Sequence, residues 1–275
     1  MQVPLAALSF LEKGNRDDLA FKESVNTIYE MTAKKKSVKV RSLDEVIAPY
    51  AAIPLSLIGY AFPTGSNVLT KSSAYVTKIL IGICVFVFVL GSFVPIVPAM
   101  SLVPIKVSQN MEWHRIITYA FLHGGIAHLL GNMWFLWVFG KVVEDNIGWK
   151  NYLMLFLISA VFSAALFIPT VSDKTIPCVG ASGAISGVIA TYLILCPKVK
   201  IKFTVFWRLG TYIKSIYAPA WGYILAWIAL NIILGIMQSG HKTVGVAYWG
   251  HIGGFIAGIA YSSLYKSFKQ VPYAP

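Results

Sequence analysis

The sequence has little charge, and acidic residues are fewer than basic ones. Charged residues make up 12% of the 275 positions and hydrophobic residues 57%, with a mean hydropathy of +0.68. Soluble domains carry about a quarter charged residues, so this chain has too little polar surface to cover a globule in water. The composition therefore predicts a protein whose natural solvent is the lipid bilayer.

The shortage of carboxylates excludes several kinds of membrane protein. None of the eleven acidic residues falls inside the six long apolar segments described below. An aspartyl intramembrane protease needs two membrane aspartates and a proton-coupled carrier usually needs a carboxylate, so neither is favoured. A zinc protease is not favoured either, because there is no HExxH sequence. Cys84, Cys178 and Cys196 form no CxxC pair and are interpreted as packing residues, so we expect no metal and no cofactor.

Long apolar segments are what the chain has in abundance. Each is expected to be helical, because every backbone polar group in lipid must be satisfied within its own segment. The six segments are 76–99, 124–140, 151–169, 182–196, 217–236 and 246–265. A shorter apolar stretch at 47–62 is interpreted as interfacial, since a span needs about 20 residues. The predicted fold class is an all-α membrane protein, a bundle of six transmembrane helices with a short fourth helix.

The basic residues give a net charge of +12, which in a soluble protein would suggest a nucleic-acid partner. Here the cations lie mostly between or before apolar runs, so no nucleic-acid partner is expected. Because the loops on one side hold most of them, the positive-inside rule places both termini in the cytoplasm, with the cell membrane as the expected location. We predict an N-terminal cytoplasmic or interfacial region (1–73), a six-helix core (74–268) and a cytoplasmic tail (269–275).

The sequence Gly180-Ala181-Ser182-Gly183 opens the fourth segment. Taken alone, such a string is typical of helix packing through small residues. The length of the segment favours a different interpretation, because a helix over Ser182–Leu195 spans only about 21 Å. The hydrocarbon core is about 30 Å thick, so Ser182 is expected about 10 Å below the outer surface. A serine at that depth needs a protein-lined, water-filled cavity, which hydrolysis also needs.

Two further helices carry polar groups at a similar depth. His251 lies about five residues, or about 8 Å, into the sixth segment, and His128 and Asn132 share one face of the second. A lone histidine on an apolar helix is more often a core residue, but the three helices run in the same direction and their polar groups match in depth. We interpret Ser182 as the nucleophile and His251 as its base, a dyad because the spans hold no carboxylate. Asn132, His128 and the Ser182 backbone N–H are predicted to bind the oxyanion.

Several separated motifs lie between Glu112 and Gly258. They are Glu112-Trp113-His114-Arg115, Phe121-Leu122-His123-Gly124, the HxxxN sequence of His128 and Asn132, Gly180-Ala181-Ser182-Gly183, and the HxxGxxxG sequence of His251, Gly254 and Gly258. Each motif is weak alone, but their order and spacing are specific, and together they resemble the rhomboid family of intramembrane serine proteases. The resemblance implies a six-helix core, a cavity that opens outward, and cleavage of transmembrane protein substrates.

The resemblance also implies a set of structural residues near the site. Gly254 and Gly258 would let the sixth segment pack closely on the fourth, as small-xxx-small packing also predicts. The other structural residues assigned in this way are Gly180, Gly183, Glu112 and Arg115.

Residue 186 departs from the family pattern. It is often an aromatic that stacks on the catalytic histidine, but here it is serine. We therefore predict a less constrained His251 ring, supported by Trp249, Tyr192 or a water. On that basis Ser186→Phe or Ser186→Tyr is expected to raise activity modestly. The alternative is that the local backbone has closed over the gap, in which case the larger residue overpacks the site and abolishes activity.

Two alternative functions belong to other classes. A catalytically inactive rhomboid-like factor would bind membrane proteins without cutting them, but such relatives generally lose the serine or the histidine. A small-solute transporter would be expected to show inverted repeats or broken helices in both halves.

Overall fold

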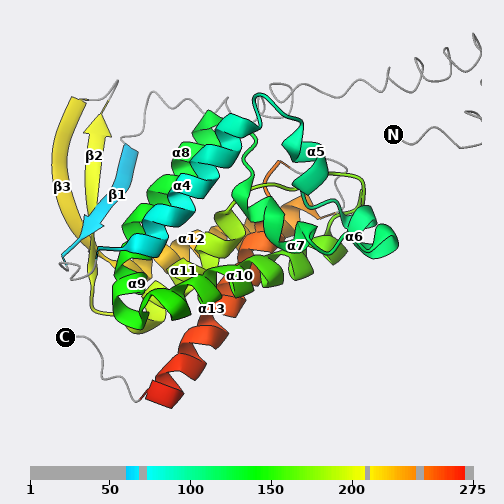
Figure 1. Cartoon of the computed structure of the whole chain (residues 1–275). Helices are drawn as coiled ribbons and strands as arrows, with labels where there is room; N and C mark the ends of the chain where they lie inside the picture. The colour runs from blue at the N-terminus through cyan, green and yellow to red at the C-terminus, as the bar shows by residue number, and fades with distance from the viewer. Residues whose placement is uncertain (1–59, 68–72, 208–210, 240–244, 270–275) are drawn as a thin grey trace, which may run out of the picture. The chain divides into compact units, whose positions relative to one another are not determined.

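The apolar segments fold into helices, and the computed structural model describes residues 60–67, 73–207, 211–239 and 245–269 (Figure 1). The helices are α4 (Tyr75–Leu90), α5 (Ile96–Met100), α6 (Pro104–Asn110), α7 (Arg115–Thr118), α8 (Ile126–Phe135), α9 (Lys141–Ile147), α10 (Trp149–Thr170), α11 (Ser182–Leu195), α12 (Ala220–Gln238) and α13 (Tyr248–Lys269). A 3-10 turn, η1 (Tyr119–Phe121), follows α7, and a π-helical segment, η2 (Leu136–Gly140), joins α8 to α9. The predicted leader and most of the 47–62 stretch and the tail lie outside the described residues.

Three helices in the described part of the chain are long and apolar enough to cross a membrane. They are the continuous helix Ile126–Ile147, α10 and α12. The apolar helices α4 and α11 are shorter, with 16 and 14 residues, while α13 has 22 residues but ends in Lys266 and Lys269. The chain is therefore a helical membrane protein, and the count of six spans stays a prediction.

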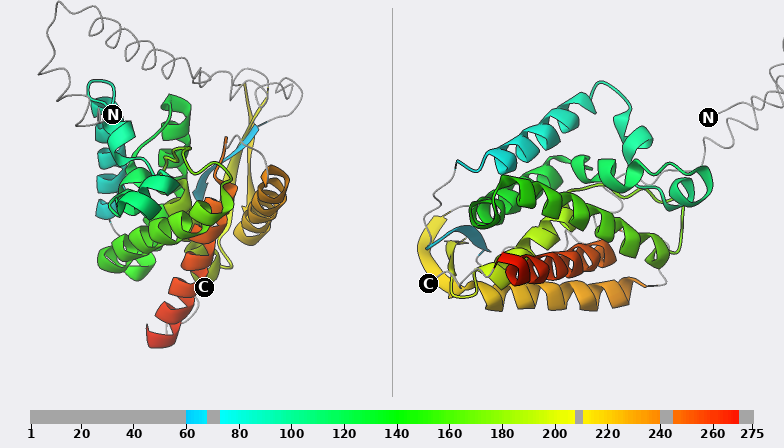
Figure 2. Two further views of the ribbon diagram at one scale, coloured as in Figure 1. Left: turned by 90° about the vertical axis from the view of Figure 1, so that its right-hand side faces the viewer. Right: turned by 60° about the horizontal axis from the view of Figure 1, so that its bottom comes forward.

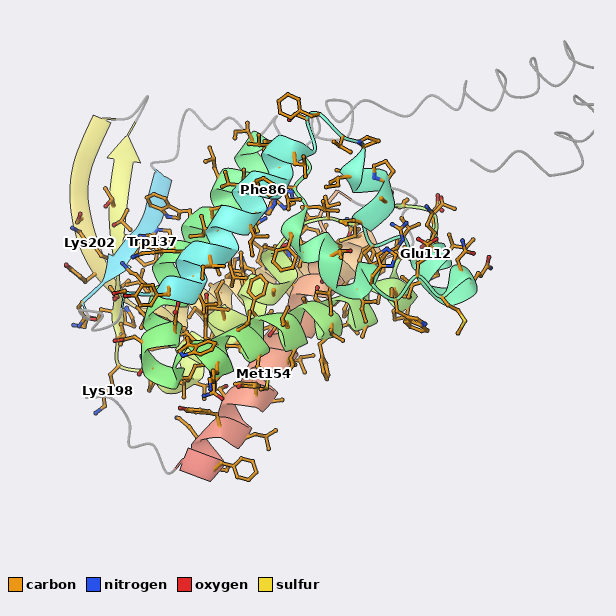
Figure 3. All side chains as sticks on the ribbon, in the orientation of Figure 1. Phe86, Glu112, Trp137, Met154, Lys198 and Lys202 are labelled. Atoms are coloured by element: carbon orange, nitrogen blue, oxygen red, sulfur yellow. The ribbon has the colours of Figure 1, made fainter. Side chains whose placement is uncertain are left out.

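A three-stranded antiparallel sheet shows that the all-α prediction is wrong. Its strands are β1 (Tyr60–Ser66), β2 (Lys200–Trp207) and β3 (Thr211–Pro219), in the order β1-β2-β3. The β2–β3 hairpin joins α11 to α12, and β1 pairs with β2 across a long stretch of sequence. The run KIKFTVFW is rich in β-branched and aromatic residues, which favour strands. Lys202 belongs to β2 and Lys198 lies just before it, and Figure 3 shows both on the opposite side of the view from Glu112.

The first predicted span is interrupted. The helix α4 ends at Leu90, and a turn separates it from α5, which begins after Pro95. Proline lacks the N–H that would continue the helix and fixes its own φ, so 76–99 does not form one helix. The third and fourth predicted segments, by contrast, agree closely with α10 and α11.

The second predicted span is longer than expected, and it contains a buried carboxylate. The helix continues past residue 140 to Ile147 and so includes Glu144, which is 4% exposed. Glu144 accepts hydrogen bonds from the backbone N–H groups of Val76 and Thr77, both at 2.9 Å, and from the Thr77 hydroxyl at 2.8 Å. A carboxylate at this place satisfies the unpaired N–H groups at the start of α4.

The helix α11 lies in the centre of the bundle, beside α10 and α13 (Figure 2). Nearly all its side chains are buried. Its contact with α13 depends on glycine: a Cβ at Gly254 would overlap the Gly183 carbonyl oxygen, and one at Gly258 would overlap the Gly187 carbonyl oxygen. The absence of side chains at these positions lets the two backbones approach closely.

Candidate active site

Ser182 is the first residue of α11, and the residues before it are held by backbone hydrogen bonds to the segment between α5 and α8. Leu102 and Cys178 exchange backbone hydrogen bonds of 3.0 and 2.8 Å, and the Gly180 N–H donates to the Tyr119 carbonyl at 3.0 Å. Gly180 has a φ of +128°, which an L side chain rarely adopts. This glycine allows the chain to turn into α11, so the Ser182 backbone N–H belongs to the unpaired first turn of a helix.

Ser182 and His251 are in hydrogen-bond contact. The Ser182 Oγ and the His251 Nε2 lie 2.8 Å apart, although 69 positions separate the residues in sequence. The glycine contact between α11 and α13 brings these two helix starts together. A serine hydroxyl in contact with an imidazole nitrogen has the arrangement of an activated nucleophile and its base.

His128 and Asn132 reach the same region from α8. A Cβ at Gly180 would meet the His128 ring at 2.7 Å and the Asn132 Nδ2 at 3.7 Å, so both side chains border the turn before Ser182. Asn132 is 8% exposed, and among the described residues its Nδ2 has no hydrogen-bond partner. A buried amide donor without a partner is costly, and it is suited to a ligand oxygen that arrives at this site.

Sequence reasoning missed Asn231, which makes a second hydrogen bond to His251. Its Oδ1 lies 2.7 Å from the His251 Nδ1. The expectation that no third residue accompanies the pair rested on carboxylates alone. An amide in the middle of an apolar span was the available signal, because buried polar groups in membrane helices are usually functional.

The His251 ring is also better supported than predicted. The Trp227 ring stacks on it with centroids 5.8 Å apart and an angle of 28° between the planes. Neither Trp249 nor Tyr192 fills this role: the Trp249 Nε1 donates to the Gly235 carbonyl, and Tyr192 packs edge-on against Phe139. The prediction of a less constrained ring is therefore wrong, because an aromatic from α12 replaces the one missing at position 186.

This contact reverses the expected effect of a larger residue at position 186. Ser186 is fully buried, and its hydroxyl donates to the Ser182 carbonyl at 2.7 Å. We expect Ser186→Phe to destabilise the protein by about 1–3 kcal/mol through overpacking, and to lower turnover. Thermal unfolding and turnover in detergent, with Ser186→Ala as the size control, test this. A gain in turnover for Ser186→Phe would contradict it.

The ion pair of Glu112 and Arg115 holds the backbone of a segment that contacts the chain before Ser182. Arg115 is 3% exposed, contacts Glu112 at 2.6 Å and donates to the carbonyl of Ser101 at 2.7 Å. The hydrogen bond from Arg115 holds the pKa of Glu112 below its ordinary value. Arg115 therefore holds the backbone at Ser101, one residue before Leu102, whose backbone pairs with Cys178.

The described residues hold no group of three or more His, Cys, Asp or Glu arranged to bind a metal ion. His123 and His128 lie near each other, with ring centroids 5.2 Å apart. The chemistry available at this site is that of the serine, the histidines and the amides.

Comparison with known proteins agrees with the resemblance seen in the sequence motifs. The model of the Rhomboid domain matches residues 110–268, which is more than half of the chain. The chain is 32% identical over 150 residues to Rhomboid protein 1, mitochondrial, of Saccharomyces cerevisiae, covering 53% of this chain and 40% of the yeast protein. It is 33% identical over 148 residues to Rhomboid protease GluP of Bacillus subtilis, covering 54% of this chain and 25% of that protein.

A third relative is Rhomboid-like protease 3 of Toxoplasma gondii, 28% identical over 166 residues, with 60% of this chain and 56% of that protein covered. The matched segment spans about half or less of the length of several of these relatives. The match to the Rhomboid domain, over residues 110–268, includes Ser182, His251, His128 and Asn132. The chain therefore belongs to the rhomboid family.

Proposed function

We propose that the protein is an intramembrane serine endopeptidase that hydrolyses peptide bonds in or near transmembrane segments of membrane proteins. The observation that carries the proposal is the 2.8 Å contact between the Ser182 Oγ and the His251 Nε2, within a chain of the rhomboid family. The names of several relatives include the word protease. An inactive rhomboid-like factor would not need a nucleophile and a base in contact.

The reaction follows from the proposed roles. The His251 Nε2 takes the proton from the Ser182 hydroxyl as Oγ attacks the substrate carbonyl carbon. The oxyanion that forms accepts hydrogen bonds from the Asn132 Nδ2, His128 and the Ser182 backbone N–H. His251 then gives the proton to the leaving amine, and the acyl-enzyme forms. In the second half of the reaction His251 takes a proton from water, which adds to the ester carbonyl of the acyl-enzyme. When the bond to Oγ breaks, the acid is released and His251 returns the proton to Ser182.

The decisive experiment is cleavage by the purified full chain, reconstituted in vesicles with a single-span substrate protein. Mass spectrometry of the fragments maps the cut. We expect one or a few cuts in or beside the transmembrane segment, and none with Ser182→Ala. Cleavage only in soluble parts of the substrate, or equal cleavage by Ser182→Ala, would contradict the proposal.

We further propose a six-span core over 74–268, preceded by a region (1–73) and followed by a tail (269–275) that are both cytoplasmic. The position of Lys198 and Lys202 at the start of β2, on the side of the view away from Glu112, supports this orientation (Figure 3). Two relatives are named as mitochondrial, so the proposal covers the side of the membrane and not the organelle. We expect a cysteine introduced at Lys198 to react with an impermeant maleimide only from the inner side of sealed vesicles. Labelling from the outer side would contradict this topology.

The oxyanion assignment has its own prediction. Asn132→Ala removes one donor and is expected to lower kcat by about 10²-fold, with a small change in KM, because the donor acts mainly in the transition state. Steady-state cleavage of the single-span substrate measures both constants. Asn151→Ala is the matched control: that amide donates to the Ile147 carbonyl. A rise in KM without a fall in kcat would instead indicate a role in substrate binding.

A further inference from the structure

The helix α12 holds the His251 ring on two sides. Asn231 meets the ring edge at Nδ1, 2.7 Å away, and Trp227 covers a ring face. These two residues are four positions apart, so they project from the same face of α12. The pair lies on neither α11 nor α13, and none of the family motifs in this sequence includes it.

The orientation of the Asn231 amide is set by its own helix. Its Nδ2 donates to the Trp227 carbonyl at 2.8 Å, one turn back. The other end of the amide, Oδ1, is therefore the atom that faces His251, and an amide oxygen only accepts hydrogen bonds. The His251 Nδ1 must then carry the proton and donate it to Asn231.

This choice of tautomer determines what the other ring nitrogen can do. A neutral imidazole has one N–H and one lone pair. With the proton on Nδ1, the lone pair is on Nε2, which faces the Ser182 hydroxyl at 2.8 Å. That arrangement makes His251 ready to accept a proton. The opposite tautomer would present an N–H to the serine and could not act as a base.

The burial of Asn231 is difficult to explain by packing alone. The residue is 5% exposed, and moving an amide from water into an apolar environment is unfavourable unless hydrogen bonds compensate. A leucine at this position would have nearly the same size and would fit the apolar helix without that penalty, as Leu230 does just before it. Around the ring, the described neighbours are Ser182, Asn231, Trp227 and Tyr248, with His128 nearby. None of these is a carboxylate, so the amide is the acceptor for Nδ1–H.

We propose that Asn231 is a positioning residue that fixes the tautomer and orientation of His251, with Trp227 as the surface on which the ring rests. The functional unit is then Ser182–His251–Asn231, with one member on each of α11, α13 and α12. This inference rests on the proposed protease function. When the ring takes the serine proton at Nε2, its Nδ1–H stays hydrogen-bonded to the Asn231 oxygen, whose dipole favours the positive charge.

The experiment compares Asn231→Leu with Asn231→Asp in the full chain. Leucine keeps the volume but removes the acceptor, so kcat is expected to fall on the order of 10²-fold with KM nearly unchanged, because the base is no longer held in place. Aspartate keeps an acceptor oxygen, so this variant should retain most of the kcat that leucine loses. Its carboxylate also stabilises the protonated ring, so the acidic limb of the pH–activity profile should move upward by roughly one to three pH units.

Two further measurements make the role specific. The labelling rate of Ser182 by a fluorophosphonate reads the activation of the nucleophile without a protein substrate, and should fall in parallel with kcat in Asn231→Leu. The control variant is Ile232→Ala, the next residue of α12, whose side chain is 42% exposed. It should leave the labelling rate and the pH profile unchanged.

The outcomes separate a failure of the positioning role from a failure of the proposed function. If Asn231→Leu cleaves and labels at the wild-type rate while Ser182→Ala is inactive, the positioning role is overturned and the proposed function stands. If Ser182→Ala cleaves normally, the proposed function itself fails. If Asn231→Leu does not fold, the pH profile of Asn231→Asp decides: an unchanged acidic limb overturns the proposal, and an upward shift supports it.

Discussion

Replacing Ser182 with alanine is expected to lower cleavage of a transmembrane substrate by about 10⁴-fold or more, and His251→Ala by a similar factor. The Ser182 Oγ and the His251 Nε2 are 2.8 Å apart, and an isolated serine hydroxyl is a poor nucleophile until a base takes its proton. Neither change creates a large cavity or places a charge in the bundle. Both variants should therefore fold, and thermal unfolding in detergent verifies this.

The double variant tests whether the two residues act together. Because each single change already stops the same step, Ser182→Ala combined with His251→Ala should be no slower than either alone. Ser267→Ala and His114→Ala are the matched controls, since both side chains are exposed and neither contacts Ser182 or His251. Multiplicative losses in the double variant, or substantial cleavage by Ser182→Ala, would show that the pair is not a catalytic unit.

The part of the site that could be predicted is the part with a titratable group or a potential nucleophile. Ser182 and His251 stand out in sequence because apolar helices of matching direction carry few polar groups, and those few must be accounted for. Asn231 does not stand out in the same way, because an amide does not titrate and carboxylates are the usual third member of such a site. Trp227 had no signal at all in the sequence. An aromatic in an apolar span is ordinary, and its contact with His251 depends on how α12 packs against α13.

The fold, too, could be predicted where its interactions are local in sequence and could not where they are long-range. Apolar runs predicted α10 and α11 closely, because a helix satisfies its hydrogen bonds within its own segment. The sheet could not be read in this way, since β1 pairs with β2 across a long separation in sequence: Ser66 lies opposite Ile201. Glu144 likewise falls outside the predicted second segment (124–140), because its reason for lying in the helix is a long-range contact: it caps the start of α4 at Thr77, 67 positions earlier.

Gly254→Ala is expected to be the most damaging small substitution outside the reacting groups. An alanine Cβ at this position would overlap the Gly183 carbonyl oxygen, and backbone cannot move aside as a flexible side chain can. The helices α11 and α13 would have to separate, which costs about 1–3 kcal/mol of stability. The larger effect falls on catalysis. Gly183 follows Ser182 and Gly254 lies three residues after His251, so separation of the helices pulls the serine from its base.

A displacement of about 1 Å between reacting groups lowers the rate by about 10²-fold. We therefore expect Gly254→Ala to lose at least that much kcat, even at a temperature where it is fully folded. The matched control is Gly82→Ala on α4, where an added Cβ meets no atom within 4 Å and helix propensity favours alanine by up to about 1 kcal/mol. Thermal unfolding and turnover measured together distinguish the two effects. Gly254→Ala with normal turnover would show that the close contact of α11 and α13 does not set the distance between Ser182 and His251.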